Sequence, residues 1–124
     1  MSTHLNHIRN QLQSAEVGQR SQAVLQLQPG NGFDDQAITL LVSVICTDAD
    51  LNVVEDATWV LVRHGQAATT ALLDALPHPE ARIRHNIVHT LGKLADADAV
   101  PALIEATDDP DPTVRLKAIY ALGQ

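Results

Sequence analysis

Apolar residues recur every three or four positions along most of the 124-residue chain, and polar residues fill the positions between them. This spacing puts an apolar stripe along one side of a helix, so it predicts helices rather than strands. The helices are predicted in pairs, each with a first and a second helix. The first helices are expected over residues 5–14, 35–47, 67–76 and 99–107, and the second helices over residues 19–28, 53–62, 83–92 and 114–123.

The predicted second helices repeat one another. Residues 114–123 match residues 83–92 at an offset of 31 positions (83 to 114), with identical Arg, Leu and Gly residues. Residues 53–62 keep the apolar pattern but have Val54 in place of the arginine. Residues 19–28 keep Arg20 and are otherwise more polar, which is typical of a terminal repeat that faces water. The unit that repeats is therefore a helix pair of 30 to 34 residues.

Cap and turn residues indicate where the helices begin and end. The prolines after His78 and Asp111 are expected in the first turn of a helix, where a missing N–H costs nothing. An aspartate is expected to cap two further helices, namely Asp98 for one and Asp34 or Asp35 for the other. Residues 29–32 and Gly65 are expected to end the first two second helices.

Several short motifs lie within residues 81–124. They include Ile83-Arg84 and Val114-Arg115, Leu91-Gly92-Lys93 and Ala121-Leu122-Gly123, Ala99-Val100-Pro101-Ala102-Leu103-Ile104, and Asp109-Pro110-Asp111-Pro112. Together they closely resemble the HEAT-like repeats first associated with phycobilisome lyases. Such repeats occur in bilin lyases, in enzyme-associated subunits and in many scaffolds, so the resemblance is more specific for architecture than for function.

The resemblance implies an all-α fold, a right-handed α-solenoid (α-α superhelix) of about four HEAT-like helix pairs. Residues 1–124 would form a single domain with approximate repeats 1–32, 33–65, 66–95 and 96–124, and the second helices would line the concave side. The resemblance also implies that Arg84 and Arg115 pair with acidic loop residues of the adjacent repeat. The candidate acids are Asp48, Asp50, Asp109 and Asp111.

Composition agrees with packed helices. Hydrophobic residues make up 45% of the chain and aromatic residues only 2%, so the core must consist of small aliphatic contacts. The net charge of −7 disfavours a nucleic-acid partner. The single Cys46 excludes an internal disulfide, and the most apolar run, residues 38–46, is too short to span a membrane. We therefore expect a cytoplasmic protein without a membrane or nucleic-acid partner.

The helical geometry separates core positions from candidate binding positions. At about 100° per residue, Val114, Ala118, Ala121 and Leu122 form the predicted core stripe of the last helix, and Leu116 and Tyr120 point away from it. The repeat offsets then align Leu25, Trp59, His89 and Tyr120 in one column. Exposed aromatic and histidine side chains often anchor partner proteins. The candidate partner-binding residues are Trp59, His85, His89, Tyr120, Glu55 and Leu116. Alternatively, the large side chains of this column fill space between successive second helices.

His85 and His89 have the spacing at which two imidazoles can bind one metal. Glu55 is the only obvious carboxylate in the adjacent column, so no metal site is expected. The acidic clusters around Asp48, Asp96 and Asp109 lack the pattern of a calcium loop and are interpreted as helix caps. The chain also lacks the His-Glu dipeptides of the di-iron hydroxylase in the resembled family.

No catalytic motif is recognisable, so the favoured function is a non-catalytic scaffold that binds another protein through its concave second-helix face. No cofactor is expected under this interpretation. The alternative, implied only by the resemblance, is a bilin lyase or bilin-handling subunit in which His85, His89 and Arg84 contact the bilin. The last repeat has no apparent cap, so either the chain is a fragment or another chain covers that end, and a homodimer through this repeat is one possibility.

Overall fold

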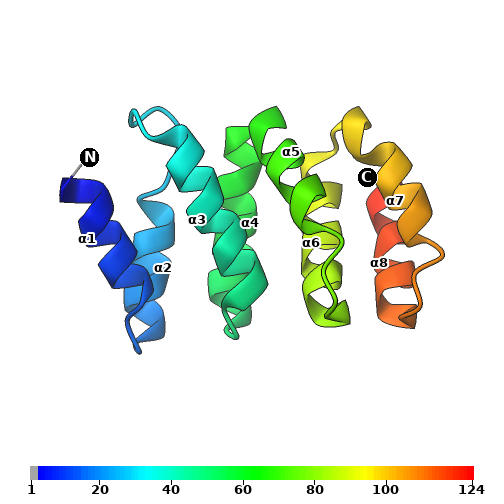
Figure 1. The fold of residues 1–124 in the computed structure, drawn as a ribbon, viewed down its shortest axis with the longest axis horizontal. Coiled ribbons are helices and arrows are strands. Elements are labelled where there is room, and N and C mark those ends of the chain that lie inside the picture. The colour runs from blue at the N-terminus through cyan, green and yellow to red at the C-terminus, as the bar shows by residue number, and fades with distance from the viewer. Residues whose placement is uncertain (1–2) are drawn as a thin grey trace. The chain divides into compact units, whose positions relative to one another are not determined.

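The computed structural model describes residues 3–124, which form eight α-helices, one 3₁₀ turn and no strand (Figure 1). The elements are α1 (Thr3–Leu12), α2 (Val17–Leu25), α3 (Asp34–Thr47), α4 (Leu51–His64), α5 (Gln66–Ala75), α6 (Ala81–Leu94), η1 (Ala97–Ala99), α7 (Val100–Ala106) and α8 (Pro112–Leu122). The predicted all-α fold of four helix pairs is confirmed. Residues 1 and 2 of the predicted first repeat lie outside the described residues.

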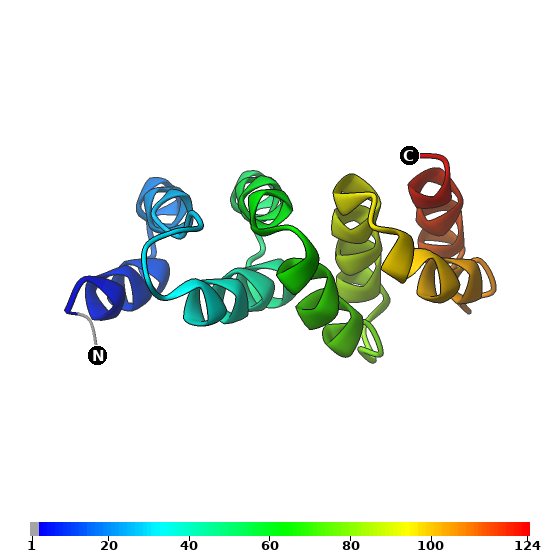
Figure 2. The ribbon, with the colours of Figure 1, turned by 90° about the horizontal axis from the view of Figure 1, so that it is seen from above.

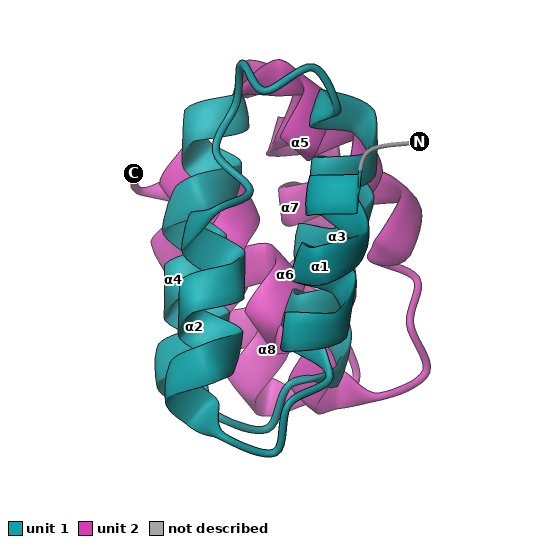
Figure 3. Ribbon diagram, turned by 90° about the vertical axis from the view of Figure 1, so that its left-hand side faces the viewer, with its two compact units in different colours: residues 1–64 teal, residues 65–124 magenta. Residues whose placement is uncertain are grey.

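The helices group into two compact units, one ending at His64 and the other running from Gly65 to Gln124 (Figure 3). In unit 1, α1 packs on α2, α3 packs on α4, and the second helices α2 and α4 pack on each other. Unit 2 repeats this scheme with α5 on α6, α7 on α8, and α6 on α8. Within each unit the first helices and the second helices form separate layers (Figure 2). Each unit is thus a stack of two helix pairs, the arrangement of a short α-solenoid.

The core of each unit is aliphatic, as the composition predicts. Leu41 and Leu61 are fully buried in unit 1, and Leu72 and Leu91 are fully buried in unit 2. Buried alanines, among them Ala57 and Ala118, let neighbouring helices approach closely.

The predicted core stripe of the last helix needs one correction. Val114, Ala118 and Ala121 are buried, but Leu122 is 38% exposed. α6 and α7 are the helices of unit 2 that pack on α8, and they cover only part of its surface. Helical geometry places Leu122 near the stripe, but only a neighbouring helix could bury it.

Two of the predicted helix starts are also wrong. Asp96, rather than Asp98, caps the 3₁₀ turn η1, because the Asp96 carboxylate accepts a hydrogen bond from the Asp98 N–H. α3 begins at Asp34, after Phe33, and the Asp34 carboxylate accepts a hydrogen bond from the Gly30 N–H. Asp34 therefore stabilises the preceding turn instead of capping the helix.

Of the other predicted boundary residues, Asp111, Pro112 and Gly65 lie as expected and Pro79 does not. Asp111 caps α8, accepting hydrogen bonds from the Thr113 and Val114 N–H groups, and Pro112 is the first residue of the helix. Pro79 lies two residues before the start of α6, so it precedes the first turn that it was expected to occupy. Gly65 separates α4 from α5 with φ of 72°, a conformation that favours glycine.

Candidate functional site

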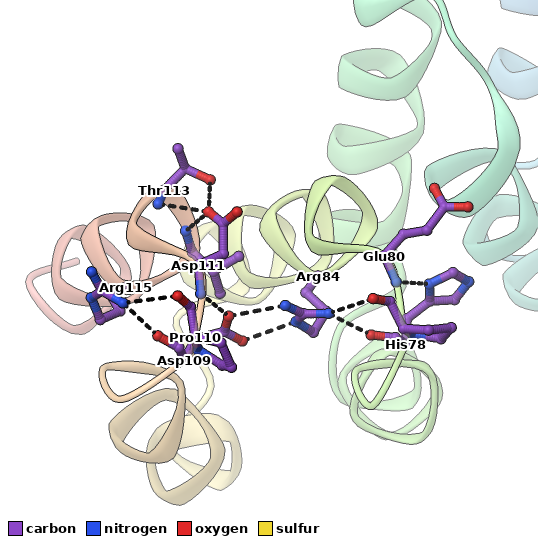
Figure 4. Close-up of polar contacts among 10 residues, drawn as sticks. His78, Glu80, Arg84, Asp109, Pro110, Asp111, Thr113 and Arg115 are labelled. Carbon is purple, nitrogen blue, oxygen red and sulfur yellow. Dashed lines mark hydrogen bonds and ion pairs between the residues drawn. The ribbon is translucent and has the colours of Figure 1, made fainter.

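One arginine of unit 2 joins the loops of successive helix pairs (Figure 4). Arg84 donates hydrogen bonds from Nη1 to the carbonyl oxygens of His78 and Pro79 in its own α5–α6 loop, at 2.8 and 3.0 Å. Its Nε and Nη2 donate to the two carboxylate oxygens of Asp109 in the α7–α8 loop, at 2.9 and 3.0 Å. The hydrogen bond from Arg84 lowers the pKa of Asp109 below its ordinary value. The pairing expected for Arg84 is therefore present, and its role is structural.

Unit 1 contains the same arrangement. Arg20 donates to the carbonyl oxygen of Ser14 and pairs through Nε with Asp48 at 2.8 Å. Asp50, another candidate acid, instead accepts a hydrogen bond from the Asn52 N–H at the start of α4. The Arg–Asp pairs thus hold the stacked pairs of each unit in register.

Arg115 does not show the acid pairing that the resemblance implied. Its Nη1 donates to the carbonyl oxygens of Asp109 and Pro110 in its own loop, at 2.8 and 3.1 Å (Figure 4). These contacts are equivalent to those of Arg84 with His78 and Pro79. Asp111, the remaining candidate acid, caps α8. Arg115 therefore stabilises the loop within its own helix pair.

The second-helix layer of unit 1 presents two of the column residues at its surface. Trp59 is 51% exposed and Leu25 is equally exposed. Glu55, one turn before Trp59 on α4, is half-buried. The large aromatic ring of Trp59 is therefore accessible and does not fill the core of unit 1.

The second-helix layer of unit 2 presents the other column residues. Tyr120 is 63% exposed and Leu116, one turn earlier on α8, is also exposed. His85 and His89 are half-buried on α6. Burial lowers the pKa of His85, and the nearby Lys117 and His89 act in the same direction. The structure thus brings His89 and Tyr120 together within one unit, while their role in binding stays a prediction.

A pocket of about 320 Å³ lies between α6 and α8 on this layer. Its lining residues are His89, Gly92, Lys93, Lys117, Tyr120, Ala121 and Gln124. The ammonium group of Lys117 lies 3.4 Å from Nδ1 of His89 and can donate a hydrogen bond to it. Neither lysine was among the candidate residues predicted from the sequence. Helical spacing offered a signal, because Lys93 follows His89 by four residues and Lys117 precedes Tyr120 by three.

A second groove, of about 620 Å³, lies on the first-helix side of unit 2. Its apolar lining includes Leu73 and Leu76 from the α5 segment and Ala102 and Ala106 from α7, and Arg84 also lines it. Nothing in the sequence pattern pointed to this groove, because its two sides come from helices that are about 30 residues apart in the chain.

Within residues 3–124, no three side chains of His, Cys, Asp or Glu are arranged to hold a metal ion. Cys46 is a half-buried thiol. No helix in the described part of the chain has both the length and the apolar character that crossing a bilayer requires.

Large apolar side chains of the last helix pair are exposed. Ile119 is 58% exposed on α8, and Ile104 is similarly exposed on α7. At the position one repeat earlier, Val88 of α6 is fully buried. The same apolar position is thus covered in one helix pair and open in the next.

Comparison with known proteins supports the repeat assignment. Residues 69–124 match the family model of HEAT repeats, which agrees with the repeated helix pairs in this part of the chain. No curated protein matches the chain. The HEAT match does not distinguish the phycobilisome lyase type from other HEAT-like repeats, so that finer resemblance stays a prediction.

Proposed function

We propose that this protein is a non-catalytic interaction module that binds a partner protein through its second helices. The exposure of Trp59 and Tyr120 carries the proposal. They are two of only three aromatic residues in the chain, and they occupy equivalent positions on α4 and α8. Aromatic side chains bury a large area when they bind and lose little conformational entropy, which makes them frequent anchors. HEAT repeats commonly serve as interaction scaffolds, which agrees with this function.

The remaining candidate residues would surround these anchors. Glu55 lies one turn before Trp59 on α4, and Leu116 lies one turn before Tyr120 on α8. His85 and His89 offer ring nitrogens on α6 of unit 2. A partner that contacts either second-helix layer would therefore meet one aromatic ring together with polar and aliphatic neighbours.

The test is quantitative affinity capture from an extract of the source cells with the intact chain, the Trp59→Ala/Tyr120→Ala variant and a control. Leu51→Ala is a suitable control, because Leu51 is also exposed but begins α4 outside the column. We expect the double variant to lose specific partners while its thermal unfolding midpoint stays near that of the intact chain. Unchanged capture by a folded double variant would contradict the proposal. A marked loss of stability would instead assign the two rings to packing.

We also propose that a second copy of this chain covers the exposed apolar side chains of α7 and α8, among them Ile104 and Ile119. At the other end of the chain, Gln11 hydrogen-bonds to Gln19, Gln22 and Gln26, so α1 and α2 present a polar surface there. Since a polar surface is a poor partner for Ile119, a symmetric contact between two C-terminal surfaces is favoured. Analytical ultracentrifugation should show a monomer–dimer equilibrium, and a strictly monomeric species up to high micromolar concentration would contradict it.

The bilin-handling alternative has a separate test. Mixing the protein with a bilin should shift the visible absorption of the bilin if the chain binds it. An unchanged spectrum would remove this alternative and leave the interaction function unaffected.

A further inference from the structure

The charged residues of unit 2 are divided between its two layers. The second helices α6 and α8 carry five cations and no acidic residue: Arg82, Arg84, Lys93, Arg115 and Lys117. All the acidic residues of this unit lie on its first helices or in the turns and loops: Asp74, Glu80, Asp96, Asp98, Glu105, Asp108, Asp109 and Asp111. In a chain with a net charge of −7, all the charged side chains on α6 and α8 are therefore basic, and one of them, Arg84, is paired with Asp109 of the α7–α8 loop.

The two lysines of the chain line one pocket of this layer. Lys93 and Lys117 are its only lysines, and both line the pocket between α6 and α8. The other lining residues include His89, Tyr120 and Gln124, and none of them has an acidic side chain. We infer that this pocket binds carboxylates of an acidic segment of the partner protein. The inference rests on the proposed function and specifies the chemistry of the partner.

The geometry suits carboxylates because the cations are held in place. Lys93 and Lys117 are both half-buried, so their side chains have fewer accessible conformations than those of fully exposed lysines. Lys117 is further oriented by His89, whose Nδ1 lies 3.4 Å from its ammonium group. Partial burial also reduces the screening of these charges by salt. A carboxylate in the pocket would meet two ammonium groups and the hydroxyl group of Tyr120.

The surroundings favour a protein segment over a small free anion. Tyr120 and Leu116 are both exposed and lie on the same helix as Lys117. An acidic segment with apolar residues could place carboxylates in the pocket and apolar side chains on these two residues. A small anion would leave the apolar neighbours uncovered. The remaining charged residues of the chain are mostly acidic and repel an acidic segment. Charge complementarity therefore directs the segment to this layer and favours one orientation of the partner.

The test uses a fluorescein-labelled synthetic peptide of twelve residues that alternates glutamate pairs with leucine, and fluorescence anisotropy with the full chain. A control peptide has glutamine in place of every glutamate. We expect the acidic peptide to bind at low salt and the control peptide to bind at least about tenfold more weakly. Raising the ionic strength to about 0.5 M should weaken binding of the acidic peptide.

Two variants assign the binding to the pocket. Lys93→Gln/Lys117→Gln should raise the Kd of the acidic peptide about tenfold, as expected for two partly screened ion pairs. Arg63→Gln/Arg82→Gln removes the same charge from two exposed positions outside the pocket and should change the Kd less than twofold. Equal effects of the two double variants, or none from the lysine variant, would overturn the inference.

Competition with inorganic phosphate distinguishes a pocket that binds an acidic protein segment from one that binds a small anion. If a few millimolar phosphate at constant ionic strength displaced the peptide completely, the pocket would be a small-anion site and the inference would fall. The outcome that contradicts the proposed function differs from the outcome that contradicts the acidic partner. Should the lysine variant bind the peptide normally while Trp59→Ala/Tyr120→Ala loses its cellular partner, the interaction function stands and the acidic partner does not.

Discussion

Gly92 shows how one residue sets the distance between two helices. A Cβ atom at this position of α6 would lie 2.8 Å from the Cβ atom and 2.9 Å from the Cα atom of Ala121 on α8. Real Cβ atoms do not approach other carbon atoms this closely, so α6 and α8 can pack at their observed distance only with glycine here. The same close contact forms part of the pocket that contains the two lysines.

We predict that Gly92→Ala destabilises the protein. Overpacking typically costs about 1–3 kcal/mol, which exceeds the roughly 0.5–1 kcal/mol that alanine gains over glycine within a helix. Gly18→Ala in α2 is the matched control, because a Cβ atom there meets nothing within 4 Å and should slightly stabilise the protein. Urea unfolding measures both changes. A Gly92→Ala variant at least as stable as the intact chain would show that the helices separate without cost.

The Arg84–Asp109 pair predicts a dependence of stability on pH. Because the pair lowers the pKa of Asp109 in the folded protein, it stabilises the fold above the unfolded pKa of about 4. This stabilisation is lost as the pH falls through the lower folded pKa. Asp109→Asn should therefore be less stable than the intact chain at pH 7, and the difference in free energy of unfolding should shrink towards pH 3.

Urea unfolding at several pH values between 7 and 3 measures this difference. Asp74→Asn, at an exposed position of α5, removes the same charge and should alter stability at pH 7 much less. A difference between Asp109→Asn and the intact chain that stayed constant down to pH 3 would mean that the ion pair does not contribute.

At the scale of elements, α6 and α8 have similar sequences but different surroundings. Val88 of α6 is fully buried, while Ile119 at the equivalent position of α8 is largely exposed. The two residues have nearly the same chemistry, so the difference comes from the helices around them. In unit 2, α8 packs on α6, and the outer side of α8 has no comparable helix within the unit.

We predict opposite outcomes for one substitution at these two positions. Val88→Glu should abolish cooperative unfolding of unit 2, because an unpaired carboxylate would be buried at a cost of several kcal/mol. Ile119→Glu should change the stability of the monomer by about 0.5 kcal/mol or less and should abolish the proposed dimer by charge repulsion. Circular dichroism on heating and sedimentation measure the two effects. If Ile119→Glu also unfolded unit 2, this surface of α8 would belong to the core.

At the scale of the whole molecule, the chain consists of two units of similar size, each with its own buried core. Units of about 60 residues bury a smaller fraction of their surface than larger domains do and are only marginally stable alone. In repeat proteins, stability is distributed as contributions of individual repeats and of contacts between neighbours. A substitution in one core should therefore act most strongly on the unit that contains it.

Hydrogen exchange tests this distribution. Leu41→Ala removes a fully buried side chain of unit 1, at a typical cost of about 2–5 kcal/mol. We expect amide exchange to accelerate strongly in α1–α4 and much less in α5–α8, as measured by mass spectrometry of peptic fragments. Equal acceleration throughout the chain would show that the two units unfold as one.

Candidate site residues were predictable only where the helix itself decides their position. Trp59 and Tyr120 point away from the apolar stripe of their own helices, so their exposure followed from the helical repeat. That Lys93 and Lys117 line the same pocket could not be predicted from the helical repeat. The two lysines lie on different helices, so their positions in the pocket depend on how closely α6 and α8 approach each other. Helix caps lie between these cases, since Asp96 and Asp98 are equally plausible caps from local sequence.

The sequence by itself determined the helices, their pairing and the repeat, because a 3.6-residue apolar period and a recurring 30 to 34 residue pattern are local properties of the chain. Tertiary structure alone decided which apolar positions are covered, leaving Ile119 and Leu122 open while Val88 and Leu91 are buried. It also decided that both lysines line one pocket. The physical reason is that burial and proximity depend on the distance between helices, which the contact of Gly92 with Ala121 helps to set.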